Sequence, residues 1–200
     1  MNGGIINPDI QVKLVTIVSI FFFVDFNMNV LSLFKPIKAF ALDVDGVLTD
    51  GSLLIMPGGE WIRRMNIKDG YALQLAIKKG YKLFIISGAV AGPVAERLRK
   101  LGVTEIHQGI QNKKQKLGAL MQQYQLDAHQ VLYMGDDMPD VEVMQSVTLR
   151  TCPADAVAEI KEICQYISPL KGGEGCVRDV IEKVMKLNNH WSTDTGVASQ

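Results

Sequence analysis

Two carboxylates follow an apolar run near residue 40. Residues 37–42 are mostly apolar, whereas Asp43 and Asp45 come directly after them and Gly46 follows. Such a run suits a central strand of a parallel sheet, and these sheets bind ligands outside the carboxyl ends of their strands. Strand geometry places both carboxylates on one side, where one could attack an electrophile and the other move a proton. Alternatively, Asp-x-Asp-Gly is an ordinary turn.

A hydroxyl and a lysine follow in similar settings. Residues 83–86 form a second apolar run, and Ser87 and Gly88 stand where it ends. A hydroxyl and the next backbone amide can donate two hydrogen bonds to a phosphoryl oxygen. Further on, several lysines beginning with Lys113 crowd the start of a helix that Asn112 is expected to cap. Positive charge opposes the helix dipole there, and a bound anion would relieve this.

Three more carboxylates, Asp136, Asp137 and Asp140, follow a third apolar run at residues 131–134. If they lay uncompensated beside Asp43, their pKa values would rise and their burial would be costly. A hard divalent cation takes such oxygen ligands, so the sequence predicts a Mg²⁺ site. Asp136 is the best candidate for a direct ligand, with Asp137 and Asp140 as direct or supporting groups. An acidic helix cap would explain Asp137 or Asp140 singly, but not all three.

Composition limits the other classes of function. The chain has 200 residues, of which 48% are hydrophobic, enough for one domain with a core. Lys+Arg and Asp+Glu number 21 each, so no nucleic-acid partner is expected. Cys152, Cys164 and Cys176 are odd in number and show no Cys-x-x-Cys spacing. We therefore expect reduced thiols in a cytoplasmic protein, without a disulfide framework or a zinc site.

The two ends of the chain differ from its centre. Residues 15–23 are strongly apolar, but a transmembrane helix needs about 20 apolar residues, so no membrane partner is expected. We interpret residues 1–34 as an apolar extension, which either reflects an upstream start codon or packs on a partner. Residues 35–188 are predicted to form the domain, and the polar residues 189–200 a disordered tail.

Between these motifs the periodicity predicts alternating strands and helices, an α/β fold with a parallel sheet flanked by helices. Helices are expected near residues 69–79, 90–101, 112–124, 141–145, 155–164 and 177–185, and further strands near 103–108, 147–150 and 166–167. Two strand-like runs around Pro57 and Gly58 predict a hairpin that overhangs the acidic loop as a flap. An isolated hairpin is only marginally stable, so self-association is expected unless the hairpin folds back on its own domain.

Taken in order, the four motifs resemble those of the haloacid dehalogenase-like (HAD) phosphatases over roughly residues 37–187. The resemblance implies a Rossmann-like sheet with the hairpin in place of a cap domain. It implies that Asp43 forms an aspartyl-phosphate and that Asp45 is the general acid and base. It implies that Ser87, Gly88 and Lys113 contact the phosphate. It also implies that the Mg²⁺ ligands are Asp43, Asp136 and the backbone carbonyl of Asp45.

Within that family, the motifs Asp-Val-Asp-Gly-Val-Leu-Thr-Asp-Gly, Asn-Ile-Lys-Asp-Gly and Gly-Gly-x-Gly-x-Val-Arg are similar to those of the 3-deoxy-D-manno-octulosonate 8-phosphate (KDO 8-phosphate) phosphatases. This similarity implies a phosphorylated 2-keto-3-deoxy sugar acid as substrate. It also implies a homotetramer with joined hairpins, in which the glycine-rich segment 171–175 reaches a neighbouring subunit's site. The implied substrate-binding residues are Arg64, Lys68, Asp69 and Arg178.

Three alternatives stay open. The KDO 8-phosphate phosphatases usually carry an arginine where this chain has Ala89, so a nine-carbon, neuraminate-type 9-phosphate is a second candidate substrate. The second alternative is a different function, that of a catalytically silent scaffold, although a scaffold would not require four converging charged groups. Phosphotransfer between sugars is a third; such relatives usually carry a large cap, which this chain has no room for.

Overall fold

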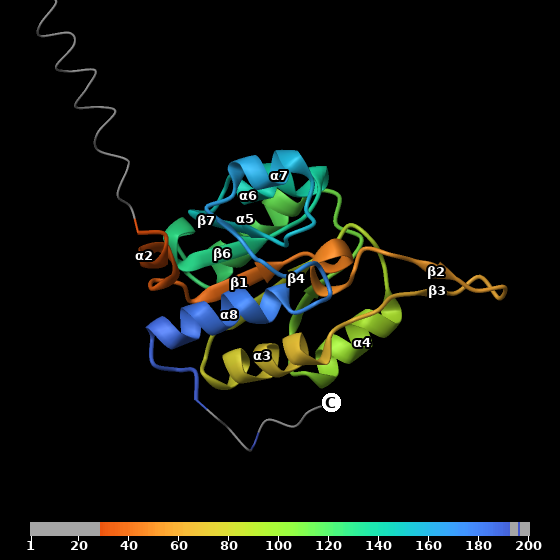
Figure 1. The fold of residues 1–200 in the computed structure, drawn as a ribbon, viewed down its shortest axis with the longest axis horizontal. Helices are drawn as coiled ribbons and strands as arrows, with labels where there is room; N and C mark the ends of the chain where they lie inside the picture. Colours follow the sequence, from red (N-terminus) through yellow and green to blue (C-terminus); the bar gives the residue numbers. More distant parts are fainter. Residues whose placement is uncertain (1–28, 193–195, 197–200) are drawn as a thin grey trace, which may run out of the picture. The chain divides into compact units, whose positions relative to one another are not determined.

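The central strand of the computed structural model is β1 (Ala39–Leu42), and all four of its residues are buried (Figure 1). It pairs in parallel with β4 on one side and with β6 on the other. The described residues form a six-stranded parallel sheet in the order β5-β4-β1-β6-β7-β8. The other strands are β4 (Lys82–Ile86), β5 (Glu105–His107), β6 (Val131–Met134), β7 (Leu149–Cys152) and β8 (Tyr166–Ile167).

The order of the strands determines where a ligand can bind. From β1 the chain builds outward to β4 and β5, and then returns to the other side of β1 to form β6, β7 and β8. In open α/β sheets a crevice forms outside the carboxyl ends of the strands at the point where this reversal occurs. That point is the end of β1, directly before Asp43. The predicted α/β architecture is therefore confirmed.

Helices cover both faces of the sheet. α5, α6 and α7 lie on one face, while α3, α4 and α8 lie on the other, with α3 packed against α8 (Figure 1). The bounds are α2 (Leu31–Phe34), α3 (Ile67–Lys78), α4 (Gly92–Lys100), α5 (Lys113–Gln123), α6 (Val141–Met144), α7 (Ala158–Ile163) and α8 (Cys176–Leu187). Because both faces are covered, the central strands are apolar throughout rather than alternating.

The structure describes residues 29–192 and residue 196, and from Leu33 onward these belong to one unit. Most of the predicted N-terminal extension lies outside the described residues, as do residues 193–195 and 197–200 of the predicted tail. Within the described ranges, none of the helices has the length and apolar character needed to cross a membrane.

The described part of the tail makes contacts with the domain. Tyr81 Oη lies 2.9 Å from Nδ1 of His190. The ring of Trp191 lies edge-on to that of Tyr71 and beneath the guanidinium group of Arg178. The chain therefore turns back after α8 and packs along α3 and α8.

The predicted hairpin is present and consists of β2 (Leu54–Ile55) and β3 (Trp61–Ile62), which pair antiparallel. It projects away from the sheet (Figure 1). Its apolar side chains are exposed: Leu54 by 61%, Ile55 by 66% and Trp61 by 60%. The alternative in which the hairpin folds back on its own domain is therefore wrong for the described chain.

Several predicted boundaries are shifted by two or three residues, and β7 and α7 are two examples. β7 begins at Leu149 rather than at Val147, because the Val147 N–H still donates to the Met144 carbonyl in the turn that ends α6. α7 begins at Ala158 rather than at Asp155, because the side chain of Asp155 instead accepts a hydrogen bond from the Gly172 N–H. Before β7 a local turn competes with the strand, whereas before α7 a contact with a residue 17 positions later holds Asp155 outside the helix.

Candidate active site

The acidic loop begins at the end of β1 and is tightly closed. The Asp43 N–H donates to the Met134 carbonyl of β6 at 3.1 Å, which fixes Asp43 beside the end of that strand. Thr49 is fully buried; its hydroxyl accepts from the Gly46 N–H and donates to the Val44 carbonyl, both at 3.3 Å. The loop therefore holds its first carboxylate at the edge of the sheet.

A cavity of about 300 Å³ opens at this edge. It is lined by Asp43, Asp45, Gly51, Ser87, Gly88, Ala89, Lys113, Asp136, Asp137 and Pro139. Ser87 and Gly88 follow β4, Lys113 begins α5, and Asp136 follows β6. The structure thus brings together the residues predicted to act on a phosphoryl group, although they are spread over almost a hundred positions of sequence.

Lys113 is anchored between two carboxylates. Its Nζ atom lies 3.0 Å from Asp43 Oδ2 and 2.8 Å from Asp140 Oδ1. Asp140 is buried and also accepts hydrogen bonds from the Tyr133 hydroxyl at 2.7 Å and the Asp136 N–H at 3.3 Å. The predicted cap is confirmed, since the Asn112 side chain accepts from the Gln115 N–H and so places Lys113 in the first turn of α5. The ammonium group therefore stands next to the proposed nucleophile.

Three carboxylates converge at the same point. Oxygen atoms of Asp43, Asp136 and Asp140 lie within 4.8 Å of one another. An all-oxygen donor set of this kind fits a hard divalent cation such as Mg²⁺. Asp137 is not part of the cluster; its carboxylate accepts from the Met138 N–H at 2.8 Å and caps a short 3₁₀ helix. The cap interpretation therefore applies to Asp137, whereas the metal interpretation fits Asp43, Asp136 and Asp140.

Burial and neighbouring carboxylates raise the pKa values of Asp43 and Asp136. Burial and the nearby Asp140 carboxylate raise the pKa of Asp43 to about 7, although Lys113 acts in the opposite direction. Burial, Asp43 and Asp140 raise the pKa of Asp136 to about 7. For Lys113, burial opposes the charge, but Asp43 and Asp140 outweigh it and raise the pKa. Additional positive charge at this site would keep both aspartates ionised.

Arg63 was not predicted from the sequence, and it contacts the second carboxylate directly. Its Nε atom donates to Asp45 Oδ1 at 2.6 Å and its Nη2 atom to Asp45 Oδ2 at 3.1 Å. The hydrogen bond to Asp45 raises the pKa of Arg63. Its neighbour Arg64, predicted to bind substrate, is 68% exposed and instead pairs with Asp50 at 2.9 Å. Alternation along a strand could have suggested that only one of the two arginines faces inward.

Three other predicted substrate residues lie outside the cavity. Asp69 is 2% exposed and accepts from the Arg178 N–H at 2.7 Å at the beginning of α8. The Arg178 guanidinium binds Glu182 at 3.2 Å. Lys68 and Arg178 line a different pocket, of about 550 Å³, which shares no residue with the acidic cavity.

The glycine-rich segment supports the acidic loop of its own chain. The Gly173 N–H donates to the Val47 carbonyl at 3.0 Å. A β-carbon at Gly172 would stand 1.9 Å from the Gly46 carbonyl oxygen, so only glycine permits this approach. Within the chain this segment packs against the loop that carries Asp43 and Asp45, and its reach to a neighbouring subunit stays a prediction.

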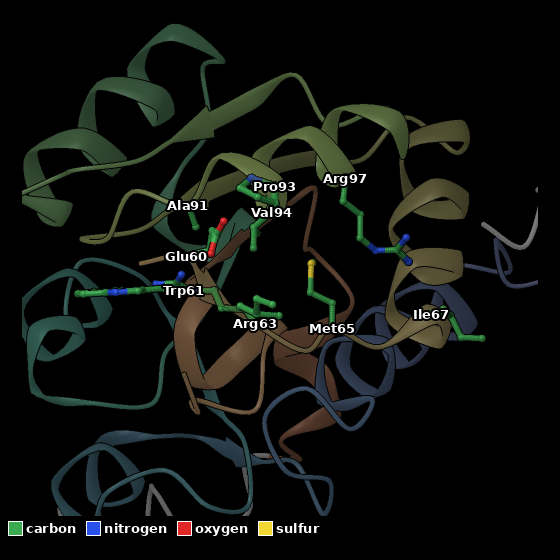
Figure 2. Close-up of a pocket in the computed structure, with 10 residues that line it drawn as sticks. Glu60, Trp61, Arg63, Met65, Ile67, Ala91, Pro93, Val94 and Arg97 are labelled. Atoms are coloured by element: carbon green, nitrogen blue, oxygen red, sulfur yellow. The ribbon is translucent and has the colours of Figure 1, made fainter. Parts of the chain in front are cut away.

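A third pocket, of about 390 Å³, lies at the base of the hairpin (Figure 2). Most of its lining is apolar and comes from the hairpin arm and α4: Glu60, Trp61, Ile62, Arg63, Met65, Ile67, Ala91, Pro93, Val94 and Arg97. Arg63 belongs to this pocket and Asp45 to the acidic cavity. The ion pair between Arg63 and Asp45 therefore lies between this pocket and the acidic cavity.

Comparisons with known proteins agree with this geometry. A family model of haloacid dehalogenase-like hydrolases matches residues 99–180. The chain is 33% identical over 157 residues to the 3-deoxy-D-manno-octulosonate 8-phosphate phosphatase KdsC of Escherichia coli K12, covering 78% of this chain and 84% of that protein. The chain belongs to the haloacid dehalogenase-like hydrolase family. The predictions of a HAD fold and of a HAD-type phosphatase are confirmed.

Solved structures of other HAD members resemble this one closely. The KDO 8-phosphate phosphatase of Yersinia pestis is 30% identical, with a TM-score of 0.79 and coverage of 86% of this chain and 91% of that chain. The enzyme of Moraxella catarrhalis, in complex with a magnesium ion, a phosphate ion and KDO, is 31% identical, with a TM-score of 0.78. That similarity covers 82% of this chain and 95% of the other.

Proposed function

We propose that this HAD-family member is a Mg²⁺-dependent phosphomonoesterase acting on a phosphorylated 2-keto-3-deoxy sugar acid, with KDO 8-phosphate as the foremost candidate. One observation carries the proposal: Asp43 stands 3.0 Å from the Lys113 ammonium and beside Asp136, in a cavity open to a ligand. A nucleophile, a cation and a hard-metal donor set at one point suit phosphoryl transfer. The KDO-containing structure of the Moraxella relative supports the choice of sugar acid.

The side chains can divide the reaction into two steps. Asp43 attacks phosphorus in line, the ester bond breaks, and Asp45 gives its proton to the departing alkoxide oxygen. Asp45 then takes a proton from water, the water oxygen attacks phosphorus, and the aspartyl-phosphate bond breaks to release phosphate and restore Asp43. Lys113, the Ser87 hydroxyl and the Gly88 amide, which line the same cavity, would stabilise the phosphoryl oxygens during both steps by charge and by hydrogen bonds.

Asp43, Asp136 and the backbone carbonyl of Asp45 are the groups that would hold Mg²⁺. When bound, the ion supplies positive charge that stabilises the phosphoryl oxygens. Asp140 supports this set through its hydrogen bonds with Lys113 and with the Asp136 N–H. We expect EDTA to abolish turnover and added Mg²⁺ to restore it.

The residues that line the cavity determine whether an eight-carbon or a nine-carbon sugar acid fits. Ala89 lines it at the position where KDO 8-phosphate phosphatases usually carry an arginine. Its methyl group cannot bind a substrate carboxylate, so a nine-carbon 9-phosphate is the second candidate substrate. The test is phosphate release from KDO 8-phosphate and from a nine-carbon 2-keto-3-deoxy sugar acid 9-phosphate, compared by kcat/KM, with Asp43→Asn as the inactive control. Equal cleavage of simple phosphate esters would refute the sugar-acid assignment.

We further propose that the enzyme is a homotetramer in the cytoplasm. The exposed apolar hairpin supports self-association, because exposed apolar patches mark protein interfaces. The three cysteines are free thiols, which suits a reducing compartment. The proposed substrate contacts of Arg64, Lys68 and Arg178 belong to this assembly, since these side chains lie outside the cavity of their own chain.

A further inference from the structure

We propose that Arg63 is a positioning residue for the acid–base chemistry of Asp45. This inference rests on the proposed function, because it assumes that Asp45 transfers protons to and from oxygen atoms at the phosphoryl group. It goes beyond the function by naming a side chain from the hairpin arm, 18 positions after Asp45, that determines how the Asp45 carboxylate is oriented.

The geometry of the pair is restrictive. Two hydrogen bonds, of 2.6 and 3.1 Å, join two nitrogen atoms of Arg63 to the two oxygen atoms of Asp45. A planar guanidinium group that contacts both oxygens fixes the rotation of the carboxylate as well as its position. The other side-chain contact of Asp45 is weaker, a 3.5 Å approach of the Thr49 hydroxyl. Arg63 is therefore the main restraint on this side chain.

Burial distinguishes this pair from an ordinary surface ion pair. The Arg63 side chain is only 5% exposed, whereas that of Asp45 is 35% exposed. The guanidinium group is thus held in the protein while the carboxylate keeps access to the acidic cavity. Exposed ion pairs contribute little because both partners move freely, and that argument does not apply here.

The arm that carries Arg63 is attached to the acidic loop. Arg63 directly follows β3, and two residues later Met65 forms a β-bridge with Thr49 of the loop. Arg63 also lines the mostly apolar pocket at the hairpin base (Figure 2). Arg63 is not among the residues that line the acidic cavity, as expected of a group that orients the Asp45 carboxylate rather than touching substrate.

The proposal can be tested by varying the leaving group. A sugar alkoxide needs a proton as it departs, whereas p-nitrophenolate leaves readily without one. General acid–base catalysis by a positioned side chain contributes roughly 10²- to 10⁴-fold, so loss of orientation alone should cost a part of this, about 10- to 100-fold. We expect Arg63→Gln to lower kcat/KM by about 10- to 100-fold on KDO 8-phosphate, but by less than about 3-fold on p-nitrophenyl phosphate.

Further variants separate positioning from general damage to the fold. Arg63→Lys keeps the charge and one hydrogen bond and should restore part of the activity on the sugar ester. In an Asp45→Asn background, Arg63→Gln should cause almost no further loss, because residues acting through one another are not additive. Arg99→Gln, on the exposed face of α4, is the matched control and should leave both esters unaffected.

Three outcomes would overturn the inference alone: an equal loss on both esters, a full additional loss in the Asp45→Asn background, or faster cleavage of the sugar ester by Arg63→Gln. The last would mean that Arg63 withholds Asp45 from the substrate. If the unaltered enzyme with Mg²⁺ cleaved neither ester, the proposed function would be wrong and the inference with it.

Discussion

Asp136 approaches Gly46 so closely that a β-carbon at position 46 would stand 1.9 Å from Asp136 Oδ2. Gly46 also has φ of +82°, a conformation that other residues rarely adopt. The loops after β1 and β6 can thus approach each other because position 46 has no side chain. This contact brings the Asp136 carboxylate to Asp43, and the metal donor set depends on it.

Gly46→Ala should therefore displace Asp136 and weaken Mg²⁺ binding. We expect the apparent Mg²⁺ affinity to fall at least about 10-fold, the lower end of the effect of disturbing groups that support metal ligands. Gly80→Ala is the matched control, because Gly80 has φ of +88° but a β-carbon there would meet nothing within 4 Å. It should lose stability through backbone strain alone, with unchanged Mg²⁺ dependence of activity. Equal Mg²⁺ titrations for both variants would contradict this account.

Lys113→Met should damage stability and activity together. It removes the ammonium group between Asp43 and Asp140 and leaves two buried carboxylates uncompensated. Breaking a buried ion pair from one side costs about 3–5 kcal/mol, which denaturant unfolding would measure. Losing one preorganised contact to the phosphoryl group should lower kcat about 10²-fold. Lys114→Met, in an exposed pair with Glu142, is the control and should change neither quantity appreciably. Full activity of Lys113→Met would exclude the role given to this lysine.

The sequence predicted the strands and the acidic residues well because short-range chemistry determines them. β1, β6 and residues 83–86 of β4 are buried on both faces, so each is an unbroken apolar run, and polar residues follow where the run ends. Asp43, Ser87 and Asp136 are recognisable for that reason. Their convergence also follows, since parallel strands present their carboxyl ends at one edge.

Tertiary contacts were beyond the reach of the sequence. Arg63 and Arg64 are adjacent and chemically identical, yet Arg63 pairs with Asp45 and Arg64 with Asp50, in an arm that a β-bridge between Met65 and Thr49 joins to the acidic loop. The Asp69 carboxylate pairs with the backbone of α8, more than a hundred residues later, a contact that no local pattern records. The sequence therefore indicated the chemistry of the site and one supporting residue, Asp140, but not the contacts of Arg63 and Asp69.

Buried Asp69 should make stability depend on pH. Burial raises the pKa of Asp69 to about 6, from an ordinary value of 3.8, although the N–H groups of Arg178 and Gly175 lower it in part. Folding therefore favours the protonated form of Asp69. The contribution of this group to the free energy of unfolding is complete below about pH 4 and is lost as the pH rises through about 6. The neutral variant Asp69→Asn should not incur this loss.

Urea unfolding of both proteins between about pH 4 and pH 7.5 would measure this effect. The free energy of unfolding of Asp69→Asn, relative to the unaltered protein, should increase with pH by up to roughly 3 kcal/mol. The other titrating groups are common to both proteins and cancel in the difference. A difference that stays constant over this range would show that Asp69 does not titrate in the folded state.

The exposed hairpin should determine the oligomeric state. Trp61→Glu places a charge among apolar side chains that are exposed in the single chain, and we expect it to convert the proposed tetramer to smaller species. Light scattering coupled to gel filtration would measure the mass. Ile167→Glu, which changes an apolar residue 44% exposed on β8, is the control and should leave the mass unchanged. A monomeric unaltered protein at every concentration would contradict the tetramer.

The central claim is that Asp43 takes up the phosphoryl group, and direct detection of the aspartyl-phosphate tests it best. Asp45→Asn should be phosphorylated by p-nitrophenyl phosphate in the presence of Mg²⁺ but should release phosphate slowly, because the base for water is missing. Acid quench and peptide mass spectrometry should then find one phosphoryl group on Asp43, and none when Asp43 is also changed to Asn. Rapid p-nitrophenol release without any phosphorylated peptide, or a phosphoryl group on another residue, would contradict the account.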